Sequence, residues 1–373
     1  MRPTTNAAGG TLPIAAKRRA RSRTHETHSL RHVADLAGVS VATASRVMSG
    51  SSHPVSHATR ARVLSAADQL AFEPNRLARA LVTSRSHTVG VIVHDIADPY
   101  FGEIVKGLED ELAPHDYRMF VTSSERDPKK ELGYVRALQA HRVDAIVFAA
   151  SSLTDPEYTK ELTAIAIPFT SRGGVMVALS DQVLDVPRVR FDNRTAVREM
   201  VRYLADLGHR QIAYIGGPSD LEVSRIRLAA FQAAIGDLDL PEHIVDGGFT
   251  VTGGELGMQS LLEQATITGV VAASDLMAIG AMRAILAAGL RVPEDVSVFG
   301  LGGIPLAAYG PVPLTTMRVP TYEMGRAGAR MLLAALDGDR PSDVVLSGAI
   351  VERDSVRAVP MARRPRIDPT VPR

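Results

Sequence analysis

The sequence contains no cysteine among its 373 residues. Disulfide bridges, thiolate metal sites and cysteine nucleophiles are therefore excluded, and a reducing cytoplasm is the expected location. No run of about 18 apolar residues occurs, so we expect no membrane-spanning helix. The basic segment Lys17-Arg18-Arg19 is not followed by an apolar stretch. We therefore expect no secretory signal.

Signature motifs of α/β enzymes are also missing. The sequence has no phosphate-binding P-loop, no His-Glu-x-x-His zinc motif and no Gly-x-Ser-x-Gly nucleophile elbow. The run Gly300-Leu301-Gly302-Gly303 is only faintly similar to a dinucleotide-binding loop, because it lacks a third glycine at the right spacing and runs into Pro305. We therefore predict that the protein is not an enzyme and binds no metal and no cofactor.

Positive charge is concentrated near the N-terminus. Residues 1–86 hold 13 lysines and arginines against 4 acidic residues, and the rest of the chain has a net charge of −8. A basic segment attached to an acidic body is typical of nucleic-acid-binding proteins. The acidic body would be repelled by DNA, so we expect the DNA contacts in the N-terminal part. The length of the chain and its 45% apolar content predict two or three domains with a sizeable core.

Residues 30–50 have the pattern of two short helices joined by a tight turn. Apolar residues recur at helical spacing in the first helix, at Leu30, Val33, Ala34 and Ala37. Gly38 can end this helix in a left-handed conformation. Ser29 and Ser40 each precede a helix and can cap it, the second helix covering residues 41–48. The pattern predicts a helix-turn-helix, and from this stretch alone an ordinary helical hairpin is the alternative.

The second helix of such a motif enters the DNA major groove. Val41 and Ala42 are small enough to approach a thymine methyl group, and Arg46 can bond to guanine or to a phosphate. Ser56 can cap a third helix. The candidate DNA contacts in these helices and their caps are Ser29, Ser40, Val41, Ala42, Thr43, Ser45, Arg46 and Ser56.

The motif Ala37-Gly38-Val39-Ser40, followed by Thr43 and then Ser45-Arg46-Val47, resembles the DNA-binding headpiece of the LacI/GalR family. The stretch from Phe72 to Leu81 resembles the hinge of that family. The resemblance implies a hinge helix that enters the minor groove, with Leu81 as a wedge between base pairs. It adds to the candidate DNA contacts Asn75, Arg76, Ala78, Arg79 and Leu81. A flexible linker is the alternative for this stretch.

From residue 87 onward, short apolar strands alternate with helices in two series. We expect strands over residues 88–93, 118–122, 145–149 and 165–170, and then over 188–191, 211–215, 269–272 and 296–300. Such alternation indicates parallel sheets covered by helices on both faces. The resemblance implies the fold class: an N-terminal all-α helix-turn-helix headpiece and an α/β two-lobed, periplasmic-binding-protein-like effector domain. The chain is expected to cross between the lobes near residues 187, 315 and 342.

The resulting division of the chain has five parts. We expect a disordered basic arm over residues 1–27, the headpiece over 28–73, the hinge and linker over 74–86, the two-lobed domain over 87–356 and a disordered tail over 357–373. The tail lacks the leucine heptads of a tetramerising coiled coil, so we expect a dimer.

The ligand of such a fold is expected in the cleft at the carboxyl ends of the strands. The resemblance implies these effector contacts: Tyr100, Phe101, Ser171, Arg172, Arg227, Phe249, Ser274, Asp275 and Gly302. An arginine beside aromatic faces suits a sugar-like or nucleoside-like ring. For any one of them a structural role is the alternative, since an arginine on an amphipathic helix is usually solvated and Asp275 can cap a helix.

Two departures from the family pattern concern this cleft. Ser171 and Gly302 stand where the family often has aspartates that accept hydrogen bonds from sugar hydroxyls. We therefore expect an effector other than a simple neutral sugar, or a loss of effector control.

The resemblance as a whole implies a cytoplasmic, nucleoid-associated transcriptional regulator. It is expected to be a repressor, and to bind a pseudo-palindromic double-stranded operator as a homodimer under the control of a small molecule. A solute-binding protein of a transporter and an α/β enzyme are the rival classes. The headpiece, the missing secretory signal and the missing catalytic motifs argue against both.

Overall fold

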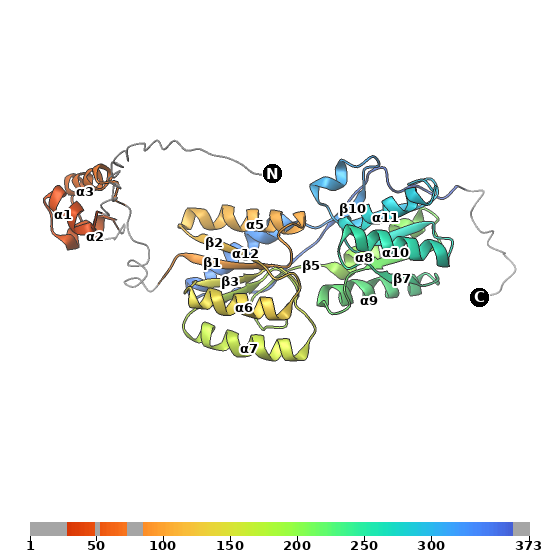
Figure 1. Ribbon diagram of the computed structural model, residues 1–373, viewed down its shortest axis with the longest axis horizontal. Coiled ribbons are helices and arrows are strands. Elements are labelled where there is room, and N and C mark those ends of the chain that lie inside the picture. The colour runs from red at the N-terminus through yellow and green to blue at the C-terminus, as the bar shows by residue number, and fades with distance from the viewer. Residues whose placement is uncertain (1–27, 49–52, 73–84, 361–373) are drawn as a thin grey trace, which may run out of the picture. The chain divides into compact units, whose positions relative to one another are not determined.

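The computed structural model describes residues 28–48, 53–72 and 85–360 (Figure 1). The chain divides into two compact units, of which the first ends at Val82 and the second begins at Thr83. The candidate hinge residues Asn75, Arg76, Ala78, Arg79 and Leu81 lie outside the described residues. Their proposed contact with the minor groove therefore stays a prediction.

The first unit contains the helices α1 (Leu30–Ala37), α2 (Val41–Met48) and α3 (His57–Gln69). Gly38 ends α1 at a φ of +64°, a left-handed conformation that glycine adopts without steric penalty. Small apolar side chains from all three helices form one core: Val33, Ala34, Ala37, Ala44, Val47, Val63, Ala66 and Ala67. This arrangement confirms the predicted helix-turn-helix fold.

The second unit has two lobes, and the first of them is built on a parallel sheet of order β2-β1-β3-β4. Its strands are β1 (Thr88–Val93), β2 (Arg118–Ser123), β3 (Ala145–Phe148) and β4 (Val175–Ala178). Its helices are α5 (Pro99–Leu112), η1 (Ala113–His115), α6 (Pro128–Ala140), α7 (Pro156–Ser171) and α12 (Thr321–Leu336). Figure 1 shows α5 above this sheet and α6 and α7 below it.

An Asp-Pro pair begins each of the helices α5, α6 and α7. The aspartates Asp98, Asp127 and Asp155 accept hydrogen bonds from backbone N–H groups of the first turn. The proline that follows needs no hydrogen-bond acceptor at this position, and its fixed φ suits the first helical turn. The sequence therefore sets the point at which each loop after a strand turns into a helix.

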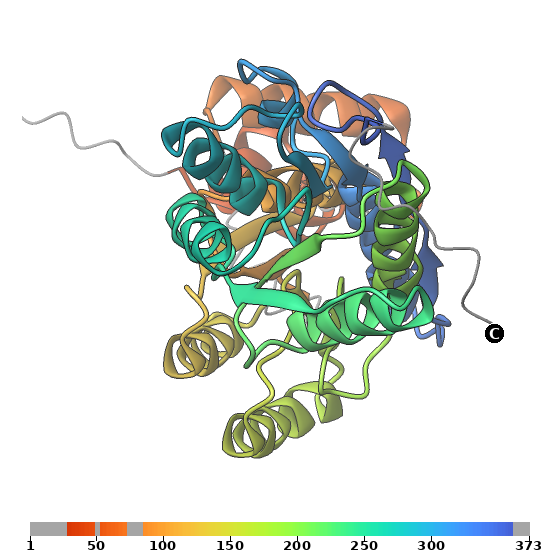
Figure 2. The same cartoon turned by 90° about the vertical axis from the view of Figure 1, so that its right-hand side faces the viewer.

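The second lobe has a sheet of order β12-β10-β9-β8-β6-β7. Its strands are β6 (Ile212–Gly216), β7 (His243–Asp246), β8 (Gly269–Ala272), β9 (Ser297–Gly302), β10 (Thr315–Arg318) and β12 (Ala349–Val351). Its helices are α8 (Asn193–Asp206), α9 (Glu222–Asp237), α10 (Val251–Gln264), α11 (Asp275–Ala287) and η2 (Pro305–Ala308). Figure 2 shows α8 and α9 in green on one side of this sheet and α10 and α11 in teal on the other.

The edge strands of this second sheet differ from expectation. β12 runs antiparallel to β10, whereas the remaining strands are parallel. β7 was not expected from the sequence, because it is short and only partly buried. The sheet is therefore mixed, within the predicted fold class.

The two lobes are joined by three passages of the chain. β5 (Val189–Phe191) leads from the first lobe into α8, and it pairs in parallel with β11 (Val344–Leu346), which leads back from α12. Between them, the chain passes from β10 into α12. These passages agree with the crossings expected near residues 187, 315 and 342.

The strand expected over residues 165–170 is wrong. These residues belong to α7, and the strand is β4. The apolar run from Ile165 to Phe169 is typical of a strand in composition, but its burial follows helical spacing: Leu162, Ala166 and Phe169 are buried while Ile167 is 59% exposed. The error of about ten residues in the strand position carries over to two of the candidate site residues.

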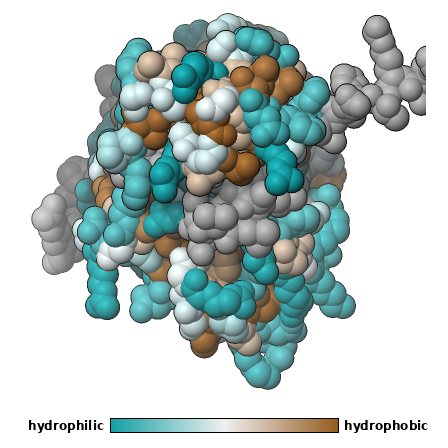
Figure 3. Space-filling model, turned by 90° about the vertical axis from the view of Figure 1, so that its left-hand side faces the viewer, coloured by the Kyte–Doolittle hydropathy of each residue, from teal (hydrophilic) through white to brown (hydrophobic). Residues whose placement is uncertain are grey.

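Figure 3 shows one face of the molecule. Hydrophilic residues predominate on this face, and the hydrophobic ones form small separate groups among them. Scattered apolar residues of this kind are normal on the surfaces of folded proteins.

Candidate DNA-binding helix and effector cleft

Helix α2 presents one face to the core and the opposite face to solvent. Ala44 and Val47 are buried, and Val41, Ala42, Ser45 and Arg46 are exposed. Thr43 is partly buried beside them. The exposed set combines small apolar groups, a hydroxyl and a guanidinium, which together can read base edges in a major groove.

The caps of the headpiece helices fix where each helix starts. Ser40 Oγ accepts a hydrogen bond from the Thr43 N–H (3.1 Å) and lies 2.9 Å from the Thr43 hydroxyl oxygen. Ser56 Oγ accepts one from the Thr59 N–H (3.3 Å) at the start of α3. At Ser29 the backbone N–H donates to Nδ1 of His32 (3.3 Å), so His32 performs part of the capping. These serines thus have a structural role in the free protein.

The second unit contains a cavity of about 90 Å³ between its lobes. Residues that follow strands of both sheets line it, including Tyr100 and Phe101 after β1, Phe249 after β7, and Ser274 and Asp275 after β8. Arg227 on α9 and Gly302 at the end of β9 line it as well. The carboxyl ends of parallel strands are the general location of ligand sites in such sheets.

Backbone hydrogen bonds close one side of this cavity. The Thr154 N–H donates to the Asp220 carbonyl (2.8 Å), and the Glu222 N–H donates to the Ser152 carbonyl (3.1 Å). The Val223 N–H donates to Ser151 Oγ (3.0 Å). Residues 151–154 belong to the first lobe and residues 220–223 to the second, so this interlobe clasp holds the lobes together.

Arg227 is fixed by two hydrogen bonds to neutral oxygen atoms. Its Nε donates to Asn193 Oδ1 (2.7 Å) and its Nη1 to the Ala273 carbonyl (2.6 Å). Its Cζ lies 5.9 Å from the centroid of the Phe249 ring. Burial lowers the pKa of Arg227, yet an arginine stays charged at neutral pH. A positive charge therefore remains buried beside an aromatic ring.

Asp275 is used within the protein. Its carboxylate accepts hydrogen bonds from the Thr316 hydroxyl (2.6 Å) and from the backbone N–H groups of Gly303 (2.6 Å) and Ile304 (2.8 Å). Burial raises its pKa, and these hydrogen bonds lower it. Asp275 thus shapes the loop after β9, and Gly302 lies against its carboxylate at a φ of +146°.

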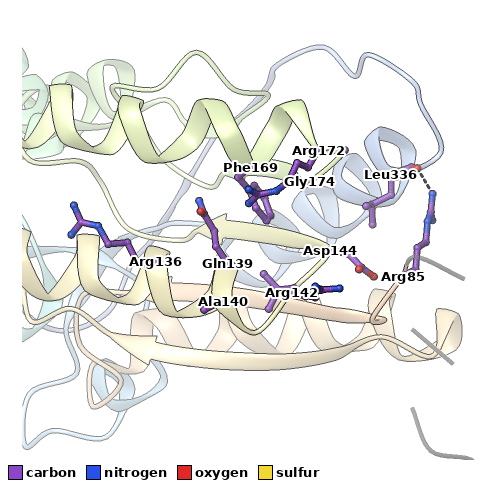
Figure 4. Close-up of a pocket in the computed structure, with 12 residues that line it drawn as sticks. Arg85, Arg136, Gln139, Ala140, Arg142, Asp144, Phe169, Arg172, Gly174 and Leu336 are labelled. Carbon is purple, nitrogen blue, oxygen red and sulfur yellow. Dashed lines mark hydrogen bonds between the residues drawn. The ribbon is translucent and has the colours of Figure 1, made fainter. Parts of the chain in front are cut away.

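Ser171 and Arg172 do not lie in the cleft. Both are exposed at the C-terminal end of α7, because the chain there is helical and β4 begins only at Val175. Figure 4 shows Arg172 beside Phe169 and Gly174 in a groove that Arg85, Arg136 and Arg142 also line. The groove is at the amino ends of β1, β3 and β4, opposite to the ends that line the cavity. The effector role expected for Ser171 and Arg172 is therefore wrong.

Several cavity residues were not among the candidates from the sequence. His94 follows β1, Arg126 follows β2, and Ser151 and Ser180 follow β3 and β4. Asp98, the N-cap of α5, lines the cavity too. For His94, Arg126 and Ser151 the position after predicted strands was the available signal, since parallel strands end at the cleft. Ser180 follows β4, a strand that was expected about ten residues too early.

Arg126 lies near the Phe249 ring and has no direct ionic partner among the described residues. Its Cζ is 5.7 Å from the ring centroid, and it makes no hydrogen bond or ion pair with any residue that the structure describes. Burial lowers its pKa, and the more distant carboxylates of Asp98, Asp95 and Asp220 partly offset this effect. Phe249 itself has a φ of +57°, a strained backbone conformation of the kind that occurs at binding sites.

Two family models match the chain. One, described as bacterial regulatory proteins of the lacI family, matches residues 29–75, and one, described as a periplasmic binding protein-like domain, matches residues 201–356. The transcriptional repressor CytR of Escherichia coli K12 is 32% identical over 89% of this chain and 97% of its own. The transcriptional regulator CelR of Thermobifida fusca is 34% identical over 88% and 98%.

This chain belongs to the lacI family. The relatives are transcriptional repressors and regulators, so this lacI-family protein is a DNA-binding transcriptional regulator and not an enzyme. The structure of the Lac repressor dimer bound to operator and the anti-inducer ONPF superimposes with a TM-score of 0.78, at 27% identity over 89% of this chain and 100% of that chain. A CelR–cellobiose complex gives a TM-score of 0.63, at 31% identity over 88% and 99%.

The described residues were also searched for membrane-spanning helices and for metal sites. No helix among them combines the length and apolar character that a membrane span requires. In the same part of the chain, no group of three or more histidine and acidic side chains is placed to hold a metal ion.

Proposed function

We propose that this lacI-family protein is a repressor that binds a pseudo-palindromic operator as a homodimer, in the cytoplasm and on the nucleoid. The observation that carries the proposal is the exposed face of α2, whose side chains have no role in the headpiece core. A two-fold dimer would place two such helices on two half-sites. The similarity to an operator-bound Lac repressor dimer supports this arrangement.

The second unit offers apolar surface for a dimer. Leu256 on α10, Leu306 in η2 and Tyr309 beside it are 60%, 55% and 83% exposed. Association with a second copy would remove these apolar side chains from water. We assign them to the contact between two copies of this chain.

The cleft of the second unit is proposed as the effector site. Its cavity is lined by residues from both lobes, so a bound molecule contacts both and changes the free energy of lobe closure. A ligand shifts DNA affinity only through its different affinities for the two lobe arrangements. A change in lobe closure would alter the spacing of the two headpieces in the dimer and thereby the affinity for DNA.

Selection of operators from a random duplex library, at physiological salt and with the purified full-length protein, tests the proposal. The expected result is a two-fold symmetric sequence with two half-sites. Enrichment of a single asymmetric half-site would contradict the dimer, and no enrichment above generic duplex would contradict sequence-specific binding.

Replacing Arg46 with alanine tests the role of α2. If Arg46 forms two hydrogen bonds to a guanine, R46A should weaken operator binding by about 1–3 kcal/mol and relax the preference at one base pair. Fluorescence anisotropy with the selected operator and with single-base variants measures both effects.

The matched control for R46A is Arg62→Ala. Arg62 is an exposed arginine of α3, outside the outward face of α2. R62A should leave the base preference unchanged, whatever it does to general DNA affinity. A uniform loss on all sequences with R46A would show that Arg46 contacts phosphate rather than a base.

A further inference from the structure

The cleft cavity contains two buried nitrogen atoms without a partner among the described residues. They are Nε2 of His94 and Nε of Arg126, and both side chains line the cavity. Buried polar atoms are nearly always hydrogen-bonded in native proteins. Unpaired nitrogen atoms that border a cavity are therefore free to hydrogen-bond to a molecule bound there.

The positive charges of the cavity lack directly bonded carboxylates. Arg227 is only 7% exposed and donates to the neutral oxygens of Asn193 and Ala273. Arg126 has no ion pair with any described residue, and its nearest carboxylates act over longer distances. Both guanidinium groups lie within 6 Å of the centroid of the Phe249 ring, at 5.7 and 5.9 Å. This concentration of cations is suited to an anion.

Hydrogen-bond acceptors for sugar hydroxyls are scarce in the same cavity. Its lining contains the carboxylates of Asp98 and Asp275. Asp275 accepts three hydrogen bonds from the protein itself, and Asp98 caps α5 by accepting from the Tyr100 N–H (3.0 Å). The cavity therefore has more donors than acceptors to offer, whereas a neutral sugar needs acceptors for its hydroxyl protons.

We propose that the effector of this cleft is a compact organic anion. Its carboxylate or phosphate group is bound by Arg126 and Arg227, and its carbon skeleton packs against Phe249. The cavity volume of about 90 Å³ is well below the roughly 300–1,000 Å³ of typical ligand pockets, which favours a small molecule. The inference rests on the proposed function of the cleft as the effector site.

A second role for Arg126 has to be separated from this one. The Asp220 carboxylate of the opposite lobe attracts the Arg126 guanidinium, so Arg126 could act as an electrostatic latch between the lobes. A latch would require no anionic ligand. The two roles differ in their effect on selectivity, because only anion binding distinguishes a charged compound from its neutral analogue.

Calorimetry and thermal-shift measurements on the full-length protein test the proposal with matched compounds. The panel pairs D-glucose with gluconate and with glucose 6-phosphate, D-ribose with ribose 5-phosphate, and benzyl alcohol with benzoate. We expect at least one anion to bind while its neutral counterpart does not, and its affinity to fall as salt is raised. Comparing the affinities for gluconate and benzoate with those for the two sugar phosphates shows whether the site prefers a carboxylate or a phosphate ester.

The anion affinity of the variant Arg126→Gln is compared with that of the unsubstituted protein, and Arg142→Gln is the matched control. Arg126 is half-buried and has no bonds to lose, so R126Q should fold, whereas Arg227 is bonded to the core. R126Q should weaken binding of the anion about ten- to a hundredfold, in line with the loss of a charged hydrogen bond. Arg142 is an exposed arginine of the same lobe outside the cavity, and R142Q should bind the anion as the unsubstituted protein does.

Three results would overturn the inference: a neutral compound binding more tightly than its anionic counterpart, no binding by any anion of the panel at millimolar concentration, or equal anion binding by R126Q and the unsubstituted protein. Operator binding is measured on the same samples without ligand. Its absence would contradict the proposed function, whereas operator binding that persists while the anions fail contradicts only the present inference.

Discussion

His94 is a buried histidine of the cleft whose pKa is strongly lowered by its surroundings. Its side chain is 4% exposed, and burial together with the charge of Arg126 lowers its pKa to about 4. Its Nδ1 lies 3.5 Å from Ser124 Oγ. At neutral pH the imidazole is therefore uncharged, and it adds no positive charge to the two arginines of the cavity.

This shift predicts an acid-sensitive stability. The unfolded chain, with a histidine pKa near 6.5, binds more protons than the folded one between about pH 6.5 and 4, so the free energy of unfolding falls as the pH falls through that window. The contribution of His94 to this loss is about 3 kcal/mol. In His94→Asn the loss between pH 7 and 4.5 should be smaller, which urea unfolding curves at several pH values measure.

Comparing the pH dependence of stability in the unsubstituted protein and in His94→Asn isolates the contribution of His94. Glu131 and Asp275 are buried acids whose pKa values burial raises, so they act in the opposite direction, and they are present in both proteins. Above pH 7 the two stability curves should run parallel. An equal fall in stability on acidification in both proteins would show that His94 is not the group responsible.

At the residue scale, some of the residues that line the cleft could be predicted from the sequence and others could not. Tyr100, Phe101 and Arg227 were expected and line the cavity. Arg126 was not, since an arginine in a polar loop is normally solvated. In the structure Arg126 is partly buried, in a loop whose backbone has a φ of +60° at this residue. The side-chain direction in such a loop is set by tertiary packing.

At the element scale, glycines allow two pairs of helices to approach closely. In the second lobe, a Cβ atom at Gly280 of α11 would collide with the backbone of Val251 and Glu255 in α10, and one at Gly254 of α10 with the backbone of Met277. In the first lobe, Gly107 of α5 is in the same position against Tyr322 of α12. Backbone atoms cannot move aside as a flexible side chain can, so these contacts require glycine.

The same substitution at two glycines should therefore have opposite effects. Gly280→Ala forces α10 and α11 apart and should lower the free energy of unfolding by about 1–3 kcal/mol. Gly133→Ala, in the middle of α6, has nothing within 4 Å of the new methyl group and should raise stability by about 0.5–1 kcal/mol. Denaturant unfolding of both variants checks the signs, and stabilisation by G280A would contradict the close packing of these helices.

Helix α7 shows where local sequence was insufficient at this scale. Its last turns contain Ile165, Ile167 and Pro168, which favour a strand or a break, and yet the helix continues to Ser171. The burial of Phe169 against the rest of the lobe stabilises the helix over the local preference. By contrast, α5 and α6 begin at Asp-Pro pairs, a local signal that the sequence does contain.

At the scale of the whole molecule, the interlobe clasp joins the two lobes beside the cavity. Leu153 of the first lobe and Leu221 of the second form an antiparallel bridge and are 3% and 0% exposed. The hydrogen bonds flanking them, from Thr154 to Asp220 and from Glu222 to Ser152, make Leu153 and Leu221 a non-hydrogen-bonded pair. Such pairs have Cα atoms about 4.5 Å apart, within the range that a disulfide spans.

Because the chain has no cysteine, the double variant Leu153→Cys/Leu221→Cys would contain a single thiol pair. Oxidation should lock the lobes in the arrangement that this structure shows. If effector control acts through lobe closure, operator affinity of the oxidised protein should no longer respond to the best-binding anion of the panel. After reduction, the anion should again change the operator affinity, by a factor within the typical range of about 5 to 150. Operator titrations by fluorescence anisotropy, with and without dithiothreitol, measure this difference.

The single variant Leu153→Cys controls for the loss of the buried leucine, since it cannot form the crosslink and should respond to the effector under both conditions. The affinity of the locked protein for operator also shows which lobe arrangement the DNA selects. Tight binding would mean that the lobe arrangement of this structure is the repressing one and that a ligand favouring it acts with the operator. Weak binding would mean that this arrangement releases DNA. A crosslinked protein that still responds fully to the effector would show that control does not pass through closure of these lobes, because a ligand can shift only an equilibrium that remains free to move.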